Sequence, residues 1–265
     1  MAEPIITFLS DFGSSDWFVA VVHGVLHTIH PTAHVVDLSH AVPPGMVARA
    51  AFVLEAAAPD FPPGTVHLVV VDPGVGTTRR ALGVSARGQH FVGPDNGVLE
   101  WALADPDAKA HELNVNRFFR QPVSRTFHGR DVFAPVAAHL AAGVPLEQMG
   151  PRADAPVRLS SNGPTHRAGE IVGHVVFVDR FGNLLTNVTE QDMSDGFPTV
   201  PQNRIHVLAL GRVIRGLSRS YGEAPVGTIL ALIGSSGRLE IAQVGGDASE
   251  RLGLGEGDQV RVRAG

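Results

Sequence analysis

The chain has 265 residues, 44% of them hydrophobic, and a formal net charge of −5 at pH 7. A chain of this size buries roughly three quarters of its unfolded surface, as one large or two smaller domains. It contains no cysteine, which excludes disulfides, thiolate metal sites and a cysteine nucleophile. Its 21 Lys and Arg residues form no basic stripe, and it shows neither a signal-peptide pattern nor an apolar run of membrane-spanning length. We therefore expect a cytoplasmic protein with no nucleic-acid or membrane partner.

The first 150 residues alternate between strand-like and helix-like patterns. The expected elements are strand 5–9, helix 16–30, strand 34–38, helix 47–58, strand 66–71, strands 81–85 and 90–92, a helix from about residue 96, and a helix over 132–142. Ser15 or Asp16 is expected to cap the first helix, and Gly143 to stop the last. The alternation predicts an N-terminal α/β domain, residues 1–150, with a mainly parallel central sheet.

A second domain is expected after a break in this pattern. Residues 151–168 are rich in Pro, Arg, Ser, Asn and Gly, which is typical of a linker. Residues 169–265 then carry short strand patterns separated by turn signals, at 169–178, 184–188, 205–209, 213–215, 228–233, 239–243 and 259–263. This spacing predicts a smaller all-β C-terminal domain, a barrel or a sandwich.

The segment 69–80, VVVDPGVGTTRR, combines a buried-looking strand with a carboxylate, two glycines and two arginines. Asp72 follows the strand, where ligands of open α/β sheets gather, and Arg79 can fold back toward it. The alternative is an ordinary surface Asp–Arg pair. A dinucleotide fingerprint fails because Arg79 occupies the third glycine position, and no Gly-Lys-Ser/Thr of a P-loop occurs in the chain.

Thirteen histidines raise the question of a metal site. His23, His27 and His30 fall near one face of the expected first helix. No carboxylate stands among them in an HExxH arrangement, so packing or surface histidines are favoured over metal ligands.

Four further segments place polar groups where a scaffold alone does not require them: SDFGSSD (10–16), FHGRD (127–131), VDRFGNLLTN (178–187) and GSSGRLEIA (234–242). Asp11 follows the first strand, on the same sheet edge as Asp72 if the strands are parallel, and an acidic crevice favours a cation or sugar hydroxyls. The alternatives are an Asx-turn for Asp11, a cap for Asp16, and a cap for Asp131 with His128 in a plain loop.

These segments, with DPGVGTTRR and GPDNG, together resemble the S-adenosylmethionine hydroxide adenosyltransferases, relatives of the fluorinase and chlorinase enzymes, over nearly the whole chain. The resemblance implies an α/β domain followed by a β-barrel, and a homotrimer with active sites at subunit interfaces. It also implies hydrolysis of S-adenosylmethionine to adenosine and L-methionine, with no cofactor and no metal.

The resemblance also assigns site residues. The catalytic set falls on Asp72, Arg79 (rather than Arg80, by spacing) and His128. Substrate-binding positions are Asp11 for the ribose hydroxyls, Asp16 and Asp179 for the methionine ammonium, Phe181 and Asn183 for adenine, and Ser235 with Ser236 for the methionine carboxylate. This chain departs from the halogenases at Ser236, where they carry arginine, and around adenine at Gln243 and Gly245.

Two other functions compete with hydrolysis. A chlorinase-like halogenase would need a dehydrated halide pocket, which Asp72 and His128 oppose, and the short connection at residues 87–89 lacks the long insertion of the fluorinases. A non-catalytic adenosine or S-adenosylmethionine binding protein would use the same polar set for recognition alone. Because a sulfonium is already a good leaving group, positioning of water is the expected catalytic task.

Overall fold

The computed structural model describes residues 4–160 and 163–265. The chain divides into two compact units, Met1–Ser160 and Ser161–Gly265. Among the described residues, no helix is both long and apolar enough to cross a membrane.

The first unit is a six-stranded sheet in the order β2-β1-β3-β5-β4-β6. Its strands are β1 Ile5–Ser10, β2 His34–Ser39, β3 Val66–Val70, β4 Ala81–Ala86, β5 Gln89–Pro94 and β6 Lys109–Glu112. Its helices are α1 Phe18–Ile29, α2 Val47–Ala57, α3 Glu100–Leu103 and α4 Ala134–Ala141, with a π-helical turn over Gly129–Phe133 that leads into α4.

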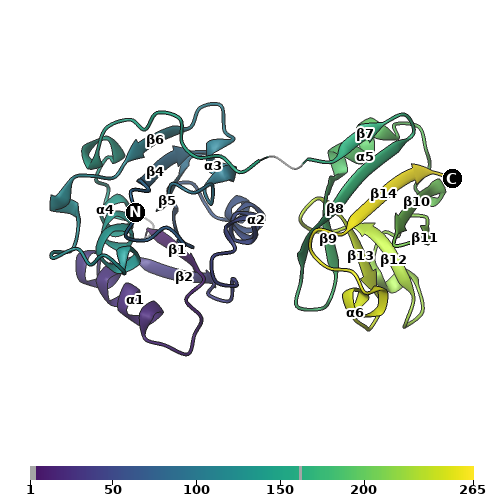
Figure 1. Cartoon of the computed structure of the whole chain (residues 1–265), viewed down its shortest axis with the longest axis horizontal. Coiled ribbons are helices and arrows are strands. Elements are labelled where there is room, and N and C mark those ends of the chain that lie inside the picture. Colours follow the sequence, from purple (N-terminus) through teal and green to yellow (C-terminus); the bar gives the residue numbers. More distant parts are fainter. Residues whose placement is uncertain (1–3, 161–162) are drawn as a thin grey trace. The chain divides into compact units, whose positions relative to one another are not determined.

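Alternate residues of the strands are buried on opposite faces of this sheet. Val66, Leu68 and Val70 of β3 join one apolar core with α1 and α4, whereas Val69 and Val71 join another with α2. Figure 1 shows α1 and α4 on one face of the sheet and α2 on the other. Burial on both faces explains why β3 reads as a continuous β-branched run.

The expectation of a mainly parallel sheet holds only in part. β2, β1, β3 and β5 are parallel neighbours, but β4 runs antiparallel to both β5 and β6. A two-residue turn, Arg87–Gly88, joins β4 to β5, and both residues have positive φ, as in a tight hairpin. The sheet is therefore mixed, and β6, which the sequence patterns did not predict, forms its edge.

Several helix boundaries also differ from expectation. The cap predicted for α1 is wrong, since its N-cap is Trp17 and no side chain caps it. α3 begins at Glu100, four residues later than expected, while Gly143 ends the α4 region with φ +87° as predicted. α4 begins later because the chain first makes the π-helical turn.

The second unit is an antiparallel sheet of eight strands in the order β11-β10-β14-β8-β9-β13-β12, with β7 paired to β8. The strands are β7 Thr165–Arg167, β8 Glu170–Val178, β9 Leu184–Thr189, β10 Ile205–Ala209, β11 Arg212–Arg215, β12 Ile229–Ile233, β13 Arg238–Gln243 and β14 Gln259–Ala264. Two short helices, α5 Glu190–Gly196 and α6 Ala248–Leu252, were not predicted. The sheet curls around its own apolar core as an open, barrel-like layer (Figure 1).

Candidate active site

Asp72, Arg79 and His128 form one hydrogen-bonded cluster just beyond the carboxyl end of β3. Arg79 Nε donates to Asp72 Oδ1 at 2.8 Å and to Oδ2 at 3.0 Å, and Arg79 Nη2 bonds to Oδ2 as well. The same Nη2 lies 2.8 Å from His128 Nδ1. The Asp72 and Arg79 side chains are only 6% and 11% exposed, so the pair is shielded from water rather than a surface ion pair.

The protonation state of His128 follows from this contact. A guanidinium can only donate, so the Nδ1 that faces Arg79 must accept, and the ring proton of the neutral imidazole sits on Nε2. Burial of the ring and the positive charge of Arg79 lower the pKa of His128, while Asp72 opposes the shift. The imidazole is therefore neutral at pH 7 and has an N–H to offer beyond the cluster.

Two glycines bring the DPGVG turn and the FHGRD segment together. Gly76 has φ +78°, and a Cβ built on it would lie 2.5 Å from the Arg125 carbonyl oxygen. A Cβ on Gly129 would lie 3.1 Å from the Phe12 ring and 3.3 Å from Val70 Cγ1. A Cβ at Gly76 would overlap the Arg125 carbonyl, and one at Gly129 would crowd its neighbours, so the two glycines permit the close approach that places His128 near the end of β3.

Other polar groups hold the frame of the cluster. Asp131 is fully buried and accepts from the Arg120 and Arg130 guanidiniums and from the Ser124 backbone N–H, so it anchors residues 120–131 rather than capping a helix. Asn96 Nδ2 donates to the Val71 carbonyl oxygen at 2.9 Å and so ties the GPDNG turn to the residue before Asp72.

Arg80 has a different partner from Arg79. Its Nε donates to Asp95 Oδ2 at 2.8 Å, and its terminal nitrogens donate to the carbonyl oxygens of Asp154 and Ala155. The two consecutive arginines therefore serve separate carboxylates, and only Arg79 reaches Asp72.

Asp11 lies near the same edge of the sheet. Parallel pairing of Ser10 with Val70 places Asp11 directly after β1, beside the residues that follow β3. Its Oδ2 accepts from the Gly45 N–H at 2.8 Å, a contact with a distant loop rather than with its own turn. Asp16 is exposed and accepts a long hydrogen bond of 3.5 Å from Ser15 Oγ.

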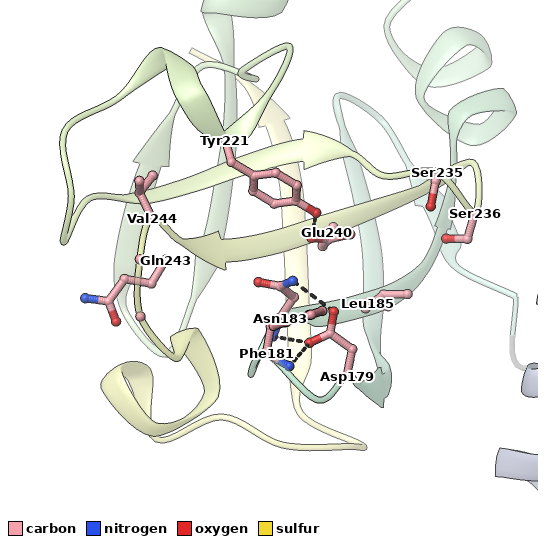
Figure 2. Close-up of a pocket in the computed structure, with 12 residues that line it drawn as sticks. Asp179, Phe181, Asn183, Leu185, Tyr221, Ser235, Ser236, Glu240, Gln243 and Val244 are labelled. Atoms are coloured by element: carbon pink, nitrogen blue, oxygen red, sulfur yellow. Dashed lines mark hydrogen bonds between the residues drawn. The ribbon is translucent and has the colours of Figure 1, made fainter. Parts of the chain in front are cut away.

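The remaining five predicted residues line one pocket of about 610 Å³ in the second unit. These are Asp179, Phe181, Asn183, Ser235 and Ser236. Figure 2 shows the two serines at one end of the pocket and Gln243 with Val244 at the other, with Tyr221 and Glu240 between them.

Asp179 organises its own loop. Its Oδ1 accepts from the backbone N–H groups of Phe181 at 2.8 Å and Asn183 at 2.9 Å, and its Oδ2 accepts from Asn183 Nδ2 at 2.8 Å. The loop turns at Gly182, φ +78°, where a Cβ would lie 2.0 Å from the Asp247 carboxylate. This arrangement leaves the Asn183 side-chain carbonyl as an acceptor and presents the Phe181 ring 74% exposed.

Sequence reasoning missed two polar residues of this pocket. Tyr221 donates its hydroxyl to Glu240 Oε1 at 2.6 Å, and Glu240 is only 5% exposed. Burial raises the pKa of Glu240, the Tyr221 hydrogen bond lowers it, and Asp179 raises it further. The carboxylate within the apolar strand LEIA was the available signal.

Ser236 contributes a buried hydroxyl group to the same pocket. Its Oγ is buried and finds no hydrogen-bond partner among the described residues. A buried hydroxyl without a partner is costly unless a ligand supplies one. This end of the pocket is therefore suited to a polar ligand group.

Comparison with known proteins gives a consistent result over the whole chain. Residues 6–150 match the family model described as SAM hydroxide adenosyltransferase N-terminal domain, and residues 173–261 match that of the C-terminal domain. A protein of Thermus thermophilus named (R)-S-adenosyl-L-methionine hydrolase is 44% identical, covering 97% of this chain and 98% of that protein. A fluorinase of Nocardia brasiliensis is 29% identical, covering 99% and 98%.

The fold has the same relatives. A solved structure of a conserved protein from Thermotoga maritima superposes with a TM-score of 0.92 at 38% identity, covering 97% of this chain and 99% of that one. Both domains thus match the family, and the chain belongs to the SAM hydroxide adenosyltransferase family.

Proposed function

We propose that this protein hydrolyses S-adenosyl-L-methionine to adenosine and L-methionine by attack of a water molecule on C5′ of the ribose. The observation that carries the proposal is the partly buried, hydrogen-bonded Asp72–Arg79–His128 cluster at the end of β3. Three proteins named (R)-S-adenosyl-L-methionine hydrolase match nearly the whole chain at 41–44% identity, whereas the fluorinase of Nocardia brasiliensis matches at 29%.

The reaction depends more on aligning a water molecule with C5′ than on activating the leaving group, because a sulfonium is already a good leaving group. As water attacks C5′, a C–O bond forms, the C5′–S bond breaks, and its electron pair neutralises the sulfonium to give methionine. A carboxylate is too weak a base to deprotonate water fully at neutral pH. Asp72 therefore accepts a hydrogen bond from the water and takes its proton only as the C–O bond forms. His128 donates its Nε2–H to the same oxygen, and Arg79, through its hydrogen bonds to Asp72 and His128, fixes the positions of both side chains.

The polar groups outside the cluster then serve recognition. The Asp11 carboxylate can accept ribose hydroxyls in addition to the Gly45 N–H. Asn183 offers its carbonyl to the adenine amino group, and the exposed Phe181 ring offers a stacking face. Ser235 and Ser236 hold the methionine carboxylate, and Asp16 and Asp179 hold its ammonium.

We further propose a homotrimer in which each site combines residues from two chains, because the cluster and the adenine residues lie in different units. Asp72→Asn and Asn183→Ala chains are each expected to be inactive. Mixing the two variants under conditions that allow their subunits to exchange should restore activity if sites are shared between chains. Full activity of a dilute monomer would contradict the proposal. The cytoplasmic location expected from the sequence stays a prediction, as does the absence of membrane and nucleic-acid partners.

The central experiment is incubation of the purified protein with S-adenosylmethionine, with and without chloride and with a chelator throughout, followed by mass identification of the nucleoside. We expect adenosine in both cases, since the proposed mechanism uses neither a metal nor a cofactor. A chlorinated nucleoside would show a halogenase instead, and unchanged substrate would show a binding protein.

Two adjacent Asp–Arg pairs provide the matched control. Arg79→Lys replaces a guanidinium that joins Asp72 to His128, so turnover should fall. Arg80→Lys alters an equally short Asp–Arg contact with Asp95 that lies outside the cluster, and turnover should persist. Equal losses in the two variants would mean that the cluster only stabilises the fold.

A further inference from the structure

His23, Asp37 and His40 form a second cluster of titratable side chains that the proposed reaction does not use. His23 Nε2 lies 2.8 Å from Asp37 Oδ1, and His40 Nε2 lies 3.0 Å from the same oxygen. The three ligand atoms all lie within 4.8 Å of one another. The helix periodicity that groups His23 with His27 and His30 does not predict this cluster, because Asp37 lies in β2 and His40 directly follows that strand.

The geometry points to a divalent transition-metal site of the zinc class, with His23 Nε2, one Asp37 carboxylate oxygen and His40 Nε2 as ligands. Two imidazoles and a carboxylate are a common three-residue ligand set for zinc. Metal–ligand bonds of about 2.0 Å place tetrahedral ligand atoms about 3.3 Å apart, so the observed separations of 2.8 and 3.0 Å need to open by only a few tenths of an ångström.

The environment of His40 favours a metal over a simple ion pair. Its Nε2 is buried and makes no hydrogen bond among the described residues, although it faces the carboxylate. On the other side of the ring, Nδ1 lies 2.7 Å from Ser10 Oγ, which already accepts from the Phe12 N–H. If Nδ1–H donates to that oxygen, the Nε2 lone pair points at Asp37, which is the tautomer that a metal requires.

Packing holds the ligands in place before any ion arrives. The buried Phe8 ring lies 4.7 Å from the His40 ring and 6.1 Å from the His23 ring, measured between centroids. The His40 side chain is 11% exposed and His23 28%, while Asp37 is 40% exposed. Solvent can therefore reach the ion and supply a water as the fourth ligand.

The consequence of an ion here is structural. The His40 carbonyl oxygen accepts from the Gly13 N–H at 2.8 Å, so fixing His40 also fixes the loop that follows β1 and carries Asp11. The ion would cross-link α1, β2 and this loop. We expect it to raise the melting temperature of the protein and to take no part in the chemistry at C5′.

The test is metal binding by the full chain, stripped with a chelator and dialysed, followed by titration with Zn²⁺ in a calorimeter and with Co²⁺ by visible absorption. We expect one equivalent of Zn²⁺, a Co²⁺ spectrum of low coordination number, and a higher melting temperature with zinc. His23→Gln and His40→Gln should bind more than about 100-fold more weakly, and Ser10→Ala, which removes the support of His40, about 10–100-fold more weakly.

His27→Gln is the matched control, because His27 is an exposed histidine one helical turn from His23 on α1. It should bind zinc like the unaltered protein. The proposal is overturned if the unaltered protein takes up no zinc, or if His27→Gln weakens binding as much as His23→Gln does. It is also overturned if His40→Gln binds undiminished. Circular dichroism of each metal-free variant verifies folding, and Asp37→Asn, at a more exposed position, offers a variant that disturbs the core least.

Discussion

Replacing Gly76 by alanine should damage catalysis more than it damages the fold. The new Cβ would lie 2.5 Å from the Arg125 carbonyl oxygen, and ordinary contact begins at 3.4 Å, so the turn and the segment before His128 must separate by about 0.9 Å. The Arg79–His128 hydrogen bond is 2.8 Å long. If that displacement reaches it, the bond opens beyond the limit of a useful hydrogen bond. A misplacement of about 1 Å in a catalytic group costs roughly 100-fold in rate, so kcat/KM should fall by about that factor.

Gly64 provides the control for backbone strain. It has φ +84°, similar to Gly76, but no heavy atom of the described structure lies within 4 Å of a Cβ built on it. Gly64→Ala should therefore lose only the roughly 1–2 kcal/mol of stability that a left-handed residue costs, and keep its turnover. Adenosine release measured by chromatography gives kcat/KM, and thermal melts give stability. Equal kcat/KM in the two variants would refute the reasoning.

Three further predictions follow from the site. Gly182→Ala should destabilise the second unit by more than Gly211→Ala in thermal melts, because both have positive φ but only Gly182 faces a carboxylate at 2.0 Å; equal losses would contradict this. As the pH is lowered, kcat/KM should fall with a midpoint below pH 6.5, because burial lowers the pKa of His128 and catalysis uses its neutral form. The stability that the neutral ring contributes should also be lost as the pH falls through the lowered pKa of His128. A kinetic midpoint above pH 6.5 would contradict this assignment. The melting temperature of Glu240→Gln, relative to that of the unaltered protein, should increase as the pH rises from acidic to neutral. The reason is that the pKa of Glu240 is raised in the folded protein, so deprotonation of this carboxyl group destabilises the unaltered protein but not the variant. A difference in melting temperature that does not change with pH would exclude the shift.

Local patterns predicted most strand positions but not all strand directions, and they missed β6 and also β7, which lies in the segment expected to be a linker. The apolar run at residues 81–85 reads the same whether its neighbours are parallel or antiparallel. The information lay in the connection, since Arg87–Gly88 is far too short for the crossover that parallel strands require. β6 was missed because it is a four-residue edge strand with charged residues at both ends, Lys109 and Glu112.

The short helices of the second unit were missed, like β6, because they are too short to show a clear pattern. α5 is only seven residues long, too short to show a hydrophobic period, yet it carries a capping box in which Thr189 and Asp192 bond reciprocally. That pair was a readable start signal. In contrast, the cap expected at Ser15 or Asp16 did not form, because α1 begins at Phe18.

The candidate site likewise contains residues that the sequence predicted and residues that only the structure reveals. Asp72, Arg79 and His128 were recognisable because each sits in a motif, and the structure brings the three into contact. Tyr221 and Glu240 are 19 residues apart in the chain and meet only through tertiary folding in the pocket of the second unit. No local pattern contains that pairing.

The most direct test of the account is hydrolysis in water enriched in oxygen-18. Attack of water on C5′ must place the heavy oxygen in the 5′-hydroxyl of adenosine and leave methionine unlabelled. The Asp72–Arg79–His128 assignment predicts labelled adenosine from the unaltered protein, and much slower formation of the same labelled adenosine by Arg79→Lys. Adenosine formed without the label, or a chlorinated nucleoside in the presence of chloride, would contradict the central claim.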